Sequence, residues 1–217
     1  IVDFAASHSI DFAVVGPDDP LALGAVDRLS SIGIPTFGPT ANAAVIESSK
    51  VFAKDLMKRY EIPTADYRVF DSADEAISYI KNNDTFPVVI KVDGLALGKG
   101  VIISDTMKNA ERAVHTIMTD RIFGESGNKV VIEEFLTGPE VSVLAFTDSN
   151  TLIPMVSSMD HKRALDGDQG LNTGGMGAIA PNPYYTKEMA ERCMEEIFIP
   201  TMNAMKQEGR PFKGCLY

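Results

Sequence analysis

Glycines and lysines follow one another closely between two short β-branched segments in the middle of the chain. Residues 88–92 and 101–103 have the composition of strands, and three glycines lie in the segment 94–100 between them. Glycine adopts positive φ angles and lets backbone N–H groups approach a ligand closely. Lys91 and Lys99 place a positive charge at each end of this turn. The pattern predicts a strand–turn–strand cradle for an anion, most simply a polyphosphate.

Two other interpretations of this turn are possible. The P-loop, G-x-x-x-x-G-K-[ST], is one residue longer, carries a hydroxyl for Mg²⁺ and opens a helix, whereas this turn opens a strand. The P-loop is therefore excluded. An ordinary hairpin with a flexible tip stays open, because glycine and lysine are common in turns. Lys91 counts against it, since a lysine that ends an apolar strand is costly to bury without an anion.

The composition is that of a soluble globular protein with one large or two small domains. Of the 217 residues, 45% are apolar and 23% are charged. The formal net charge of -10 argues against a nucleic-acid surface, so an anionic ligand must be held by a few local groups. No apolar run has membrane-spanning length and no signal peptide is evident. We expect a cytoplasmic protein with no nucleic-acid or membrane partner.

The cysteines and the first residue add two expectations. Cys193 shares a helical face with Met189 and Ile197, which predicts a buried, reduced thiol, and Cys215 lies too far away to form a metal motif with it. Ile1 is not an initiator methionine, which suggests that the chain begins inside a longer protein.

The first 47 residues have the pattern helix, strand, helix, strand. Residues 11–16 form a short apolar strand, 18–31 a helix with acids and a proline in its first turn, and 34–37 a second strand. This spacing implies parallel neighbouring strands with a right-handed crossover. A doubly wound sheet normally starts with an earlier strand and a glycine fingerprint, and neither is found. The pattern predicts a partial Rossmann-like domain over residues 1–47, truncated at its N-terminus.

The next part of the chain predicts a small subdomain of two helices on one antiparallel sheet. A helix runs from residue 48 to Pro63, and Ser72 and Thr106 have the spacing of N-caps for two more helices. The strands that alternate with these helices end at 129–133. Further strands are expected at 140–146, 152–157 and 212–217, and a long helix at 186–205 should be kinked by Pro200.

Other polar groups also have the composition of a ligand site. Lys50 lies in a first helical turn, where a cation is unfavourable, and is either solvated or directed at a phosphate near that helix end. Residues 133–136 suit the edge of a purine and Glu140 suits ribose hydroxyls, although solvated carboxylates explain them equally well. Residues 160–163 and 172–177 predict a polar loop around a small charged ligand, or a merely solvated loop.

The chain resembles the glycinamide ribonucleotide synthetase (phosphoribosylamine–glycine ligase) family of the ATP-grasp superfamily. The lysine–glycine turn is typical of the superfamily, whereas D-H-K-R at 160–163 and N-T-G-G-M-G at 172–177 are much more specific for this ligase. The other matching motifs are V-V-G-P-D at 14–18, F-G-P-T at 37–40, S-K-x-F-A-K at 49–54, K-x-D-G-L-A-x-G-K-G at 91–100 and E-E-F-L at 133–136.

The resemblance implies an α/β (α+β) protein. An ATP-grasp fold would occupy residues 48–217, with a small lid subdomain at about 64–135, after the truncated Rossmann-like (pre-ATP-grasp) domain. The implied activity is the ATP-dependent C–N ligation of glycine to 5-phosphoribosylamine through glycyl phosphate, which gives glycinamide ribonucleotide in purine biosynthesis. ATP and Mg²⁺ (or Mn²⁺) are the implied cofactors. The metal ligands are expected beyond Tyr217, so this piece alone should be inactive, and no catalytic residue is assigned.

The resemblance also implies roles for individual residues. At ATP these are Lys50 and Lys91 at the phosphates, Gly94, Gly98, Lys99 and Gly100 in a loop that closes over them, Glu133, Glu134, Phe135 and Leu136 at adenine, and Glu140 at ribose. At the other substrates they are Gly16, Pro17, Asp18, Asp160, His161, Lys162, Arg163, Asn172, Thr173, Gly174, Gly175, Met176 and Gly177. Two alternatives stay open: another ATP-grasp carboxylate–amine ligase or carboxylase, and a non-catalytic nucleotide-binding module.

Overall fold

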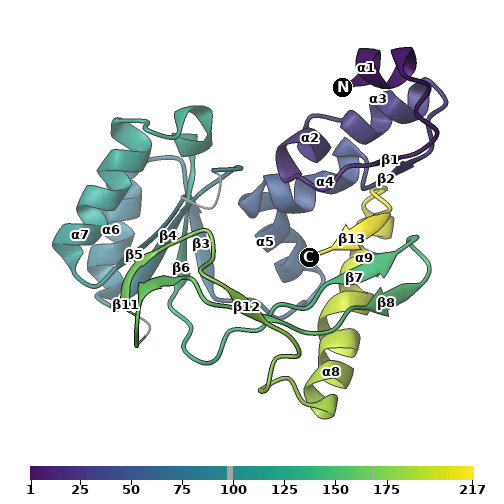
Figure 1. Ribbon diagram of the computed structural model, residues 1–217. Helices are drawn as coiled ribbons and strands as arrows, with labels where there is room; N and C mark the ends of the chain where they lie inside the picture. The colour runs from purple at the N-terminus through teal and green to yellow at the C-terminus, as the bar shows by residue number, and fades with distance from the viewer. Residues whose placement is uncertain (97–99, 168) are drawn as a thin grey trace. The chain divides into compact units, whose positions relative to one another are not determined.

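The computed structural model describes residues 1–96, 100–167 and 169–217 (Figure 1). The chain divides into two compact units, which we call unit 1 (Ile1–Ala44 with Gly138–Tyr217) and unit 2 (Val45–Thr137). The predicted domain boundary after residue 47 and the lid at about 64–135 stay predictions. In the described part of the chain, every helix is too short or too polar to cross a lipid bilayer.

Unit 2 is built on a four-stranded antiparallel sheet. Its strands lie in the order β3 (Tyr67–Phe70), β6 (Val130–Glu134), β4 (Val88–Val92) and β5 (Val101–Ser104). The helices α6 (Ala73–Asn83) and α7 (Met107–Val114) pack on the same face of the sheet (Figure 1). The predicted arrangement of two helices on one antiparallel sheet is confirmed.

Alternation along the strands gives this sheet two different faces. Ile90 and Val92 of β4 lie beside Ile132 and Val130 of β6, and all four are buried in one core with α6 and α7. The residues between them point to the opposite face. On that face Lys91 pairs with Val131, and Val89 pairs with Glu133. The register therefore places a lysine and a glutamate together on the face that carries no α6 or α7.

Three helices of unit 2 begin at polar N-caps, and the sequence predicts two of these caps, Ser72 and Thr106. The side chains of Ser49, Ser72 and Thr106 accept hydrogen bonds from the backbone N–H groups of Phe52, Glu75 and Asn109, at 3.1, 3.4 and 3.3 Å. The first of these caps starts α5 (Lys50–Arg59), which ends before Pro63. A π-helical turn, η1 (His115–Thr119), continues α7, and a 3₁₀ turn, η2 (Gly124–Asn128), precedes β6.

The N-terminal part of unit 1 contains the predicted parallel pair of strands. After α1 (Val2–Ser7), β1 (Ala13–Val14) pairs with β2 (Thr36–Phe37), and α4 (Ala41–Ser48) follows them. The single helix expected at 18–31 is wrong, because the chain forms α2 (Asp18–Ala22) and α3 (Ala25–Ser31). Gly24 separates them with a φ of 79°, a left-handed conformation that interrupts a helix.

The remaining strands of unit 1 are short. β7 (Ala145–Thr147) lies between β13 (Gly214–Leu216) and β8 (Leu152–Pro154) in a three-stranded sheet. Two further antiparallel pairs join β9 (Met159–Asp160) to β12 (Ala178–Ile179), and β10 (Arg163–Leu165) to β11 (Gln169–Asn172). The strands expected at 140–146 and 152–157 are longer than observed. Pro154, which lacks an N–H group, ends the second of them.

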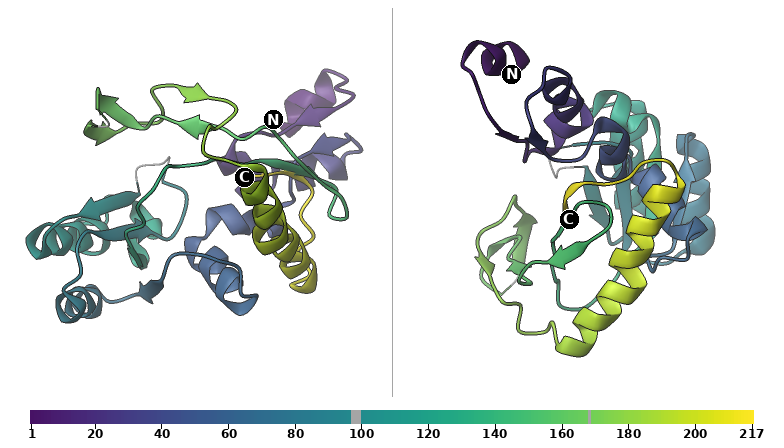
Figure 2. Two further views of the ribbon diagram at one scale, coloured as in Figure 1. Left: turned by 90° about the horizontal axis from the view of Figure 1, so that it is seen from below. Right: turned by 90° about the vertical axis from the view of Figure 1, so that its right-hand side faces the viewer.

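The long C-terminal helix also differs from its prediction. It runs as α8 (Lys187–Cys193), a π-helical turn η3 (Met194–Phe198) and α9 (Ile199–Gln207), which follow one another in one line (Figure 2). A π turn shifts the hydrogen-bond partners by one residue. The helix can therefore continue past Pro200, which has no N–H group to donate. The buried thiol predicted for Cys193 is wrong. Cys193 is partly exposed, because Met189 and Ile197 on its helical face are 44% and 41% exposed.

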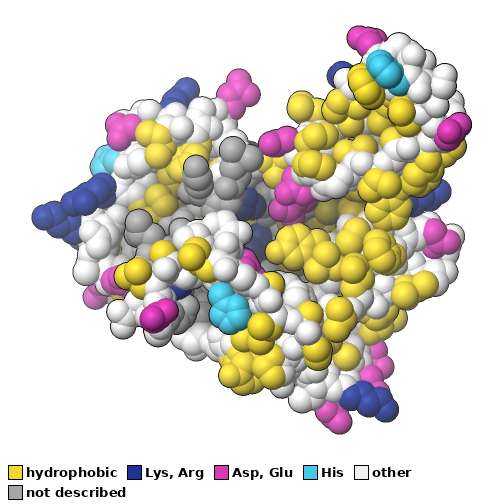
Figure 3. Space-filling view, in the orientation of Figure 1, with side chains coloured by type: hydrophobic (Ala, Val, Ile, Leu, Met, Phe, Trp, Pro, Cys, Tyr) yellow, Lys and Arg dark blue, Asp and Glu magenta, His cyan; other side chains and the backbone are white. Residues whose placement is uncertain are grey.

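Unit 1 leaves more large apolar side chains uncovered than unit 2. Phe12, just before β1, is 58% exposed, and Val14, within β1, is 67% exposed. Leu23, between α2 and α3, is 74% exposed. In the space-filling view hydrophobic side chains gather over this part of unit 1 (Figure 3). The small core beneath them contains Ala5, Leu29 and Ile34. The buried core of unit 2 lies between its sheet and the helices α6 and α7.

Candidate functional site

The first turn of α5 is bound to the beginning of the glycine-rich turn. Asp93 Oδ1 accepts hydrogen bonds from Ser49 Oγ at 3.0 Å and from the Val51 N–H group at 3.1 Å. The N–H group of Asp93 donates in turn to the carbonyls of Ser126 and Lys129. Asp93 thus supplies the negative charge that a helix N-terminus favours. A carboxylate of the chain itself occupies the position that the sequence suggested for a phosphate.

Lys50 points from this helix toward the same turn. Its Nζ donates to the carbonyl oxygen of Gly94 at 2.9 Å, and the bond is partly buried. Burial lowers the pKa of Lys50, and the charge of Lys91 lowers it further, against the opposing attraction of Glu47, Asp93 and Glu133. A solvated Lys50 is therefore wrong. Lys50 donates to Gly94, and Lys91 lies in the strand that leads into the same turn, so both lysines serve the beginning of the glycine-rich turn.

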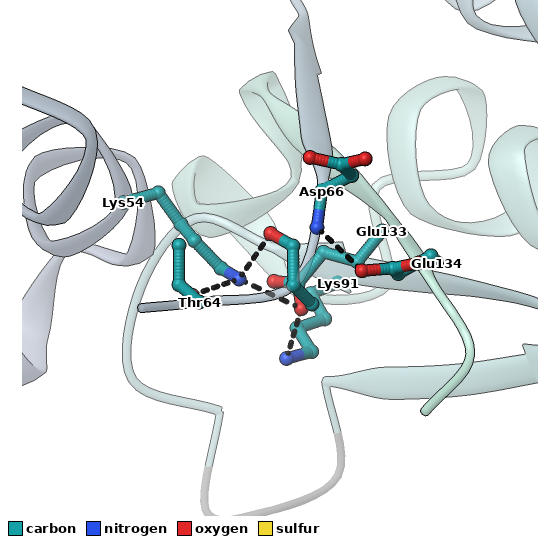
Figure 4. A network of polar contacts seen from close by, with 7 residues as sticks. Lys54, Thr64, Asp66, Lys91, Glu133 and Glu134 are labelled. Atoms are coloured by element: carbon teal, nitrogen blue, oxygen red, sulfur yellow. Dashed lines mark hydrogen bonds and ion pairs between the residues drawn. The ribbon is translucent and has the colours of Figure 1, made fainter. Parts of the chain in front are cut away.

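Lys91 and Glu133 meet on the face of the sheet opposite α6 and α7, where a second lysine joins them. Lys91 Nζ lies 2.8 Å from Glu133 Oε2, and Lys54 Nζ of α5 lies 3.1 Å from the same oxygen (Figure 4). Glu133 is only 5% exposed and its Oε1 has no hydrogen-bond partner among the described residues. Solvation does not explain this carboxylate. Two cations against one buried anion leave the cluster with a net positive charge.

Lys54 is the most enclosed of these lysines. It is 7% exposed, and its Nζ also donates to Thr64 Oγ1 at 2.8 Å and to the carbonyl of Ala65 at 3.2 Å. Burial lowers the pKa of Lys54 although the neighbouring Glu133 favours the charged form. The ring of Tyr67 lies beneath the Nζ atoms of Lys54 and Lys58, at 5.6 and 6.0 Å from its centroid.

β6 ends at Glu134, and the residues after it lie toward solvent. Glu134 is exposed and its Oε1 accepts the N–H group of Asp66 at 3.0 Å, as the close view shows (Figure 4). Phe135 is 37% and Leu136 is 65% exposed. A cavity of about 220 Å³ adjoins this end of the sheet and is lined in part by Asp66, Glu133 and Glu134. Phe135 and Leu136 thus present an apolar surface beyond the end of β6, while the backbones of Glu133 and Glu134 are paired in the sheet.

Two of the glycines in the turn are required by their surroundings. Gly94 has a φ of 146°, and a Cβ there would overlap Ser126, 3.0 Å from its Cβ. A Cβ on Gly100 would lie 2.7 Å from Ala96 Cβ. The backbone therefore packs closely at both ends of the turn, as the sequence predicts. Gly98 and Lys99 lie outside the described residues.

Glu140 and the predicted substrate residues all belong to unit 1. Glu140 forms an ion pair with Lys162, whose Nζ lies 3.2 Å from Glu140 Oε1 and 3.3 Å from Asp160 Oδ2. Burial alone would lower the pKa of Lys162, but its hydrogen bonds with Glu140 and Asp160 outweigh burial and raise it. The side chain of Glu140 is 53% exposed. The structure thus joins Glu140 to the D-H-K-R motif by charge.

The D-H-K-R and N-T-G-G-M-G motifs lie against one another. The N–H groups of His161, Thr173 and Met176 donate to the carbonyls of Gly177, Lys162 and His161, at 2.8, 2.7 and 2.8 Å. Arg163 Nη1 donates to the carbonyl of Gly170 at 2.8 Å. The backbone of Asn172 pairs with Arg163 in the β10–β11 hairpin, and nothing is described of its side chain. The two motifs form one backbone-bonded segment.

The small residues of the second motif have different surroundings. Gly175 has a φ of 125°, and a Cβ there would lie 3.0 Å from Asp160 Oδ1, whereas Gly174 has open space around it. Thr173 Oγ1 donates to the carbonyl of Lys162 at 2.9 Å. Met176 is 61% exposed. Gly175 is therefore the glycine of this motif that a close approach requires.

Gly16, Pro17 and Asp18 lie at the turn that leads from β1 into α2. Pro17 is the N-cap residue of α2 and Asp18 lies in its first turn. All three are exposed or nearly so, and the structure brings them into no polar cluster among its described residues. Their predicted role at a substrate stays a prediction.

The sequence analysis assigned no role to Lys54 or Asp93. Lys54 follows Lys50 by four residues in a predicted helix, so both had to lie on one face, and this spacing was the available signal. Asp93 stands beside a glycine in a turn, a position that is usually structural. Among the described residues, no cluster of three His, Cys, Asp or Glu side chains has the geometry of a metal site.

Comparison with known families finds matches over the whole chain. Residues 48–217 match the family described as phosphoribosylglycinamide synthetase, ATP-grasp (A) domain, and residues 1–47 match phosphoribosylglycinamide synthetase, N domain. Over all 217 residues the chain is 50% identical to a phosphoribosylamine–glycine ligase of Neisseria meningitidis and 46% identical to one of Escherichia coli. It covers 51% and 50% of these relatives. The chain thus spans about half the length of the curated relatives it matches.

Solved structures show the same similarity. The phosphoribosylamine–glycine ligase of Thermotoga maritima superposes with a TM-score of 0.75 at 35% identity, over 83% of this chain and 45% of that one. A biotin carboxylase of Campylobacter jejuni superposes with a TM-score of 0.77 at 18% identity, over 99% of this chain and 46% of that one. The second likeness concerns the fold alone.

Proposed function

The chain belongs to the phosphoribosylglycinamide synthetase family, and from this membership we propose that it forms the ATP-binding part of a phosphoribosylamine–glycine ligase. Family membership and likeness to solved structures confirm the predicted ATP-grasp fold with an N domain before it. The reaction would join glycine to 5-phosphoribosylamine at the expense of ATP and give glycinamide ribonucleotide. We place this reaction in the cytoplasm, as a step of purine biosynthesis.

The observation that carries this proposal is the cluster of cations on the face of the unit 2 sheet opposite α6 and α7. Lys50 Nζ donates to the carbonyl of Gly94 in the glycine-rich turn at 2.9 Å, and Lys91 lies in the strand that leads into this turn. Lys91 is 27% exposed at its side chain, so it is accessible to a ligand. A polyphosphate that meets both lysines would relieve their repulsion and replace the water around them.

The residues of the chain would bind and orient ATP, which supplies the phosphoryl group that activates the glycine carboxylate as glycyl phosphate. Lys50 and Lys91 would neutralise the phosphate charge and fix its direction. Residues 133–136 would hold adenine, with backbone groups at the end of β6 and with Phe135 and Leu136 as the apolar part. Glu140 would accept hydrogen bonds from the ribose hydroxyls.

The residues of unit 1 would serve the other two substrates. Asp160 to Arg163 and Asn172 to Gly177 form one backbone-bonded segment with both signs of charge, which suits glycine as a zwitterion and a phosphorylated sugar. Gly16, Pro17 and Asp18 would face phosphoribosylamine from the N domain. The described residues contain no carboxylate cluster that fits Mg²⁺, so we assign no residue of this chain to the metal.

Calorimetric titration of the purified chain with ATP tests this proposal. Lys91→Ala should weaken ATP binding by about 1.5–3 kcal/mol, the contribution of a charge-assisted hydrogen bond. Lys108→Ala on the exposed side of α7 is the matched control and should leave the affinity unchanged. Repeating the titration with and without Mg²⁺ separates metal binding from phosphate binding. An ATP affinity that is the same in Lys91→Ala and wild type would refute the phosphate role of Lys91.

A substrate screen separates the ligase from its runners-up. An assembled enzyme that contains this chain should form phosphate from ATP only when glycine and phosphoribosylamine are both present. Turnover of a different carboxylate would favour another ATP-grasp ligase or a carboxylase. ATP binding without turnover of any carboxylate would favour a nucleotide-binding module.

A further inference from the structure

We propose that Lys54 is a positioning residue for Lys91: it neutralises Glu133, so that Lys91 can leave this carboxylate and bind a phosphate. The inference rests on the proposed function, because it assumes that Lys91 meets a polyphosphate. It concerns a residue that touches no ligand itself. Lys54 and Lys91 share one oxygen of this carboxylate, Glu133 Oε2.

Lys54 has no donor left for a ligand. A lysine ammonium has three N–H donors. Those of Lys54 face Thr64 Oγ1, the carbonyl of Ala65 and Glu133 Oε2, at 2.8, 3.2 and 3.1 Å (Figure 4). Its side chain is 9% exposed. Lys54 is thus a fixed positive charge beside Glu133, held by the segment between α5 and β3.

Lys91 has the opposite character. Among the described residues Glu133 is the acceptor that its Nζ contacts, and its side chain is 27% exposed. Two of its three donors therefore have no acceptor within the described chain. Lys91 is free to exchange its partner, whereas Lys54 is not.

The exchange requires that Glu133 stay compensated when Lys91 leaves. A buried carboxylate without a partner is strongly unfavourable, and Glu133 Oε1 already lacks a hydrogen bond among the described residues. With Lys54 in place, one ion pair remains after Lys91 moves. Without Lys54, Lys91 would be the one remaining ion-pair partner of Glu133 among the described residues, and a phosphate would have to compete with that buried pair.

Paired binding measurements test this role in the whole chain. Lys54→Met should weaken the affinity for ATP at least about tenfold, equal to about 1.4 kcal/mol, and leave the affinity for adenosine unchanged. Adenosine lacks the phosphates, so a merely structural loss would weaken both ligands alike. Lys58→Met is the matched control, because Lys58 also lies in α5 over the Tyr67 ring. It should change neither affinity.

Removal of the carboxylate charge should reverse the effect. In Lys54→Met/Glu133→Gln no buried anion competes for Lys91, so the ratio of ATP affinity to adenosine affinity should return to the wild-type value. Lys54→Gln keeps hydrogen-bond donors for Thr64 and Ala65 and serves if Lys54→Met does not fold. Equal weakening of both ligands, or a ratio that the double variant does not restore, would overturn the proposal.

A measurement without nucleotide separates this inference from the proposed function. The rate at which an acetylating reagent modifies Lys91, followed by peptide mass spectrometry, should fall in Lys54→Met and recover in the double variant. Failure of the wild-type chain to bind ATP would refute the ATP site, while the labelling rates would still decide the coupling of the lysines. Equal rates in wild type and Lys54→Met would refute that coupling.

Discussion

Asp93 binds the first turn of α5 through the N–H group of Val51, at 3.1 Å from its Oδ1 atom. The same oxygen accepts the hydroxyl of Ser49, which is the N-cap residue of α5. One carboxylate therefore joins the glycine-rich turn after β4 to the helix that carries Lys50 and Lys54. The position of these lysines relative to Lys91 depends on this joint.

Loss of the Asp93 carboxylate should loosen the joint. Asp93→Ala removes two hydrogen bonds and the charge at the N-terminus of α5, so the free energy of unfolding should fall by about 0.5–2 kcal/mol. Urea denaturation measures this change, and hydrogen exchange at the Val51 amide should become faster. Asp71→Ala, at an exposed position, is the control and should change neither the free energy of unfolding nor the exchange rate at Val51. An unchanged exchange rate at Val51 would contradict the assigned bond.

The close packing at Gly94 gives a second prediction. Gly94→Ala places a Cβ against Ser126 in a backbone conformation that side chains rarely adopt, so the free energy of unfolding should fall by about 1–3 kcal/mol. Gly174→Ala is the matched control, since nothing lies within 4 Å of a Cβ at that position. If urea denaturation gives both variants the same free energy of unfolding, the backbone at Gly94 accepts a Cβ without strain and the prediction is wrong.

The sequence predicts unit 2 well because local signals and tertiary packing agree there. Ser72 and Thr106 cap their helices as their spacing indicates, and the β-branched segments form the sheet. In residues 138–185 the strands are two to four residues long. They depend on non-local bonds such as the bridge between Ser142 and Ser158, which leaves no periodic pattern in the sequence.

The sequence predicts which residues belong to the site, but not which of them contact one another. The motif places Lys91 and Glu133 in two strands, and their meeting depends on the register in which Val89 pairs with Glu133. Lys54 reaches Glu133 because α5 crosses near β3, which no local pattern encodes. A buried Glu133 with two lysines therefore emerges from tertiary structure alone.

Glu140 gives a prediction for unit 1. Its ion pair with Lys162 is half exposed, so Glu140→Gln should change the free energy of unfolding by less than about 1 kcal/mol. If Glu140 binds the ribose, the same variant should lose most of the preference for ATP over an analogue without ribose hydroxyls, about tenfold or more. Asp166→Asn, at an exposed position, is the control and should leave the preference for ATP over that analogue unchanged. A preference that persists in Glu140→Gln would exclude the ribose role.

The hydroxyl of Tyr67, whose ring lies beneath Lys54 and Lys58, should lose its proton at a higher pH than an ordinary tyrosine. Burial, and then the hydrogen bond from its hydroxyl to Asp55 Oδ1 at 2.7 Å, raise its pKa from 10.0 to about 12. The folded chain thus keeps a proton that the unfolded chain loses first, so this contribution to stability is complete below pH 10.0 and is lost as the pH rises through about 12.

The ultraviolet absorbance of tyrosinate, compared between wild type and Tyr67→Phe, isolates this residue. Asp55→Asn should lower the midpoint toward 10.0, because it removes the charged acceptor. A Tyr67 midpoint near 10.0 in the folded wild-type chain would refute the burial of the hydroxyl beside α5.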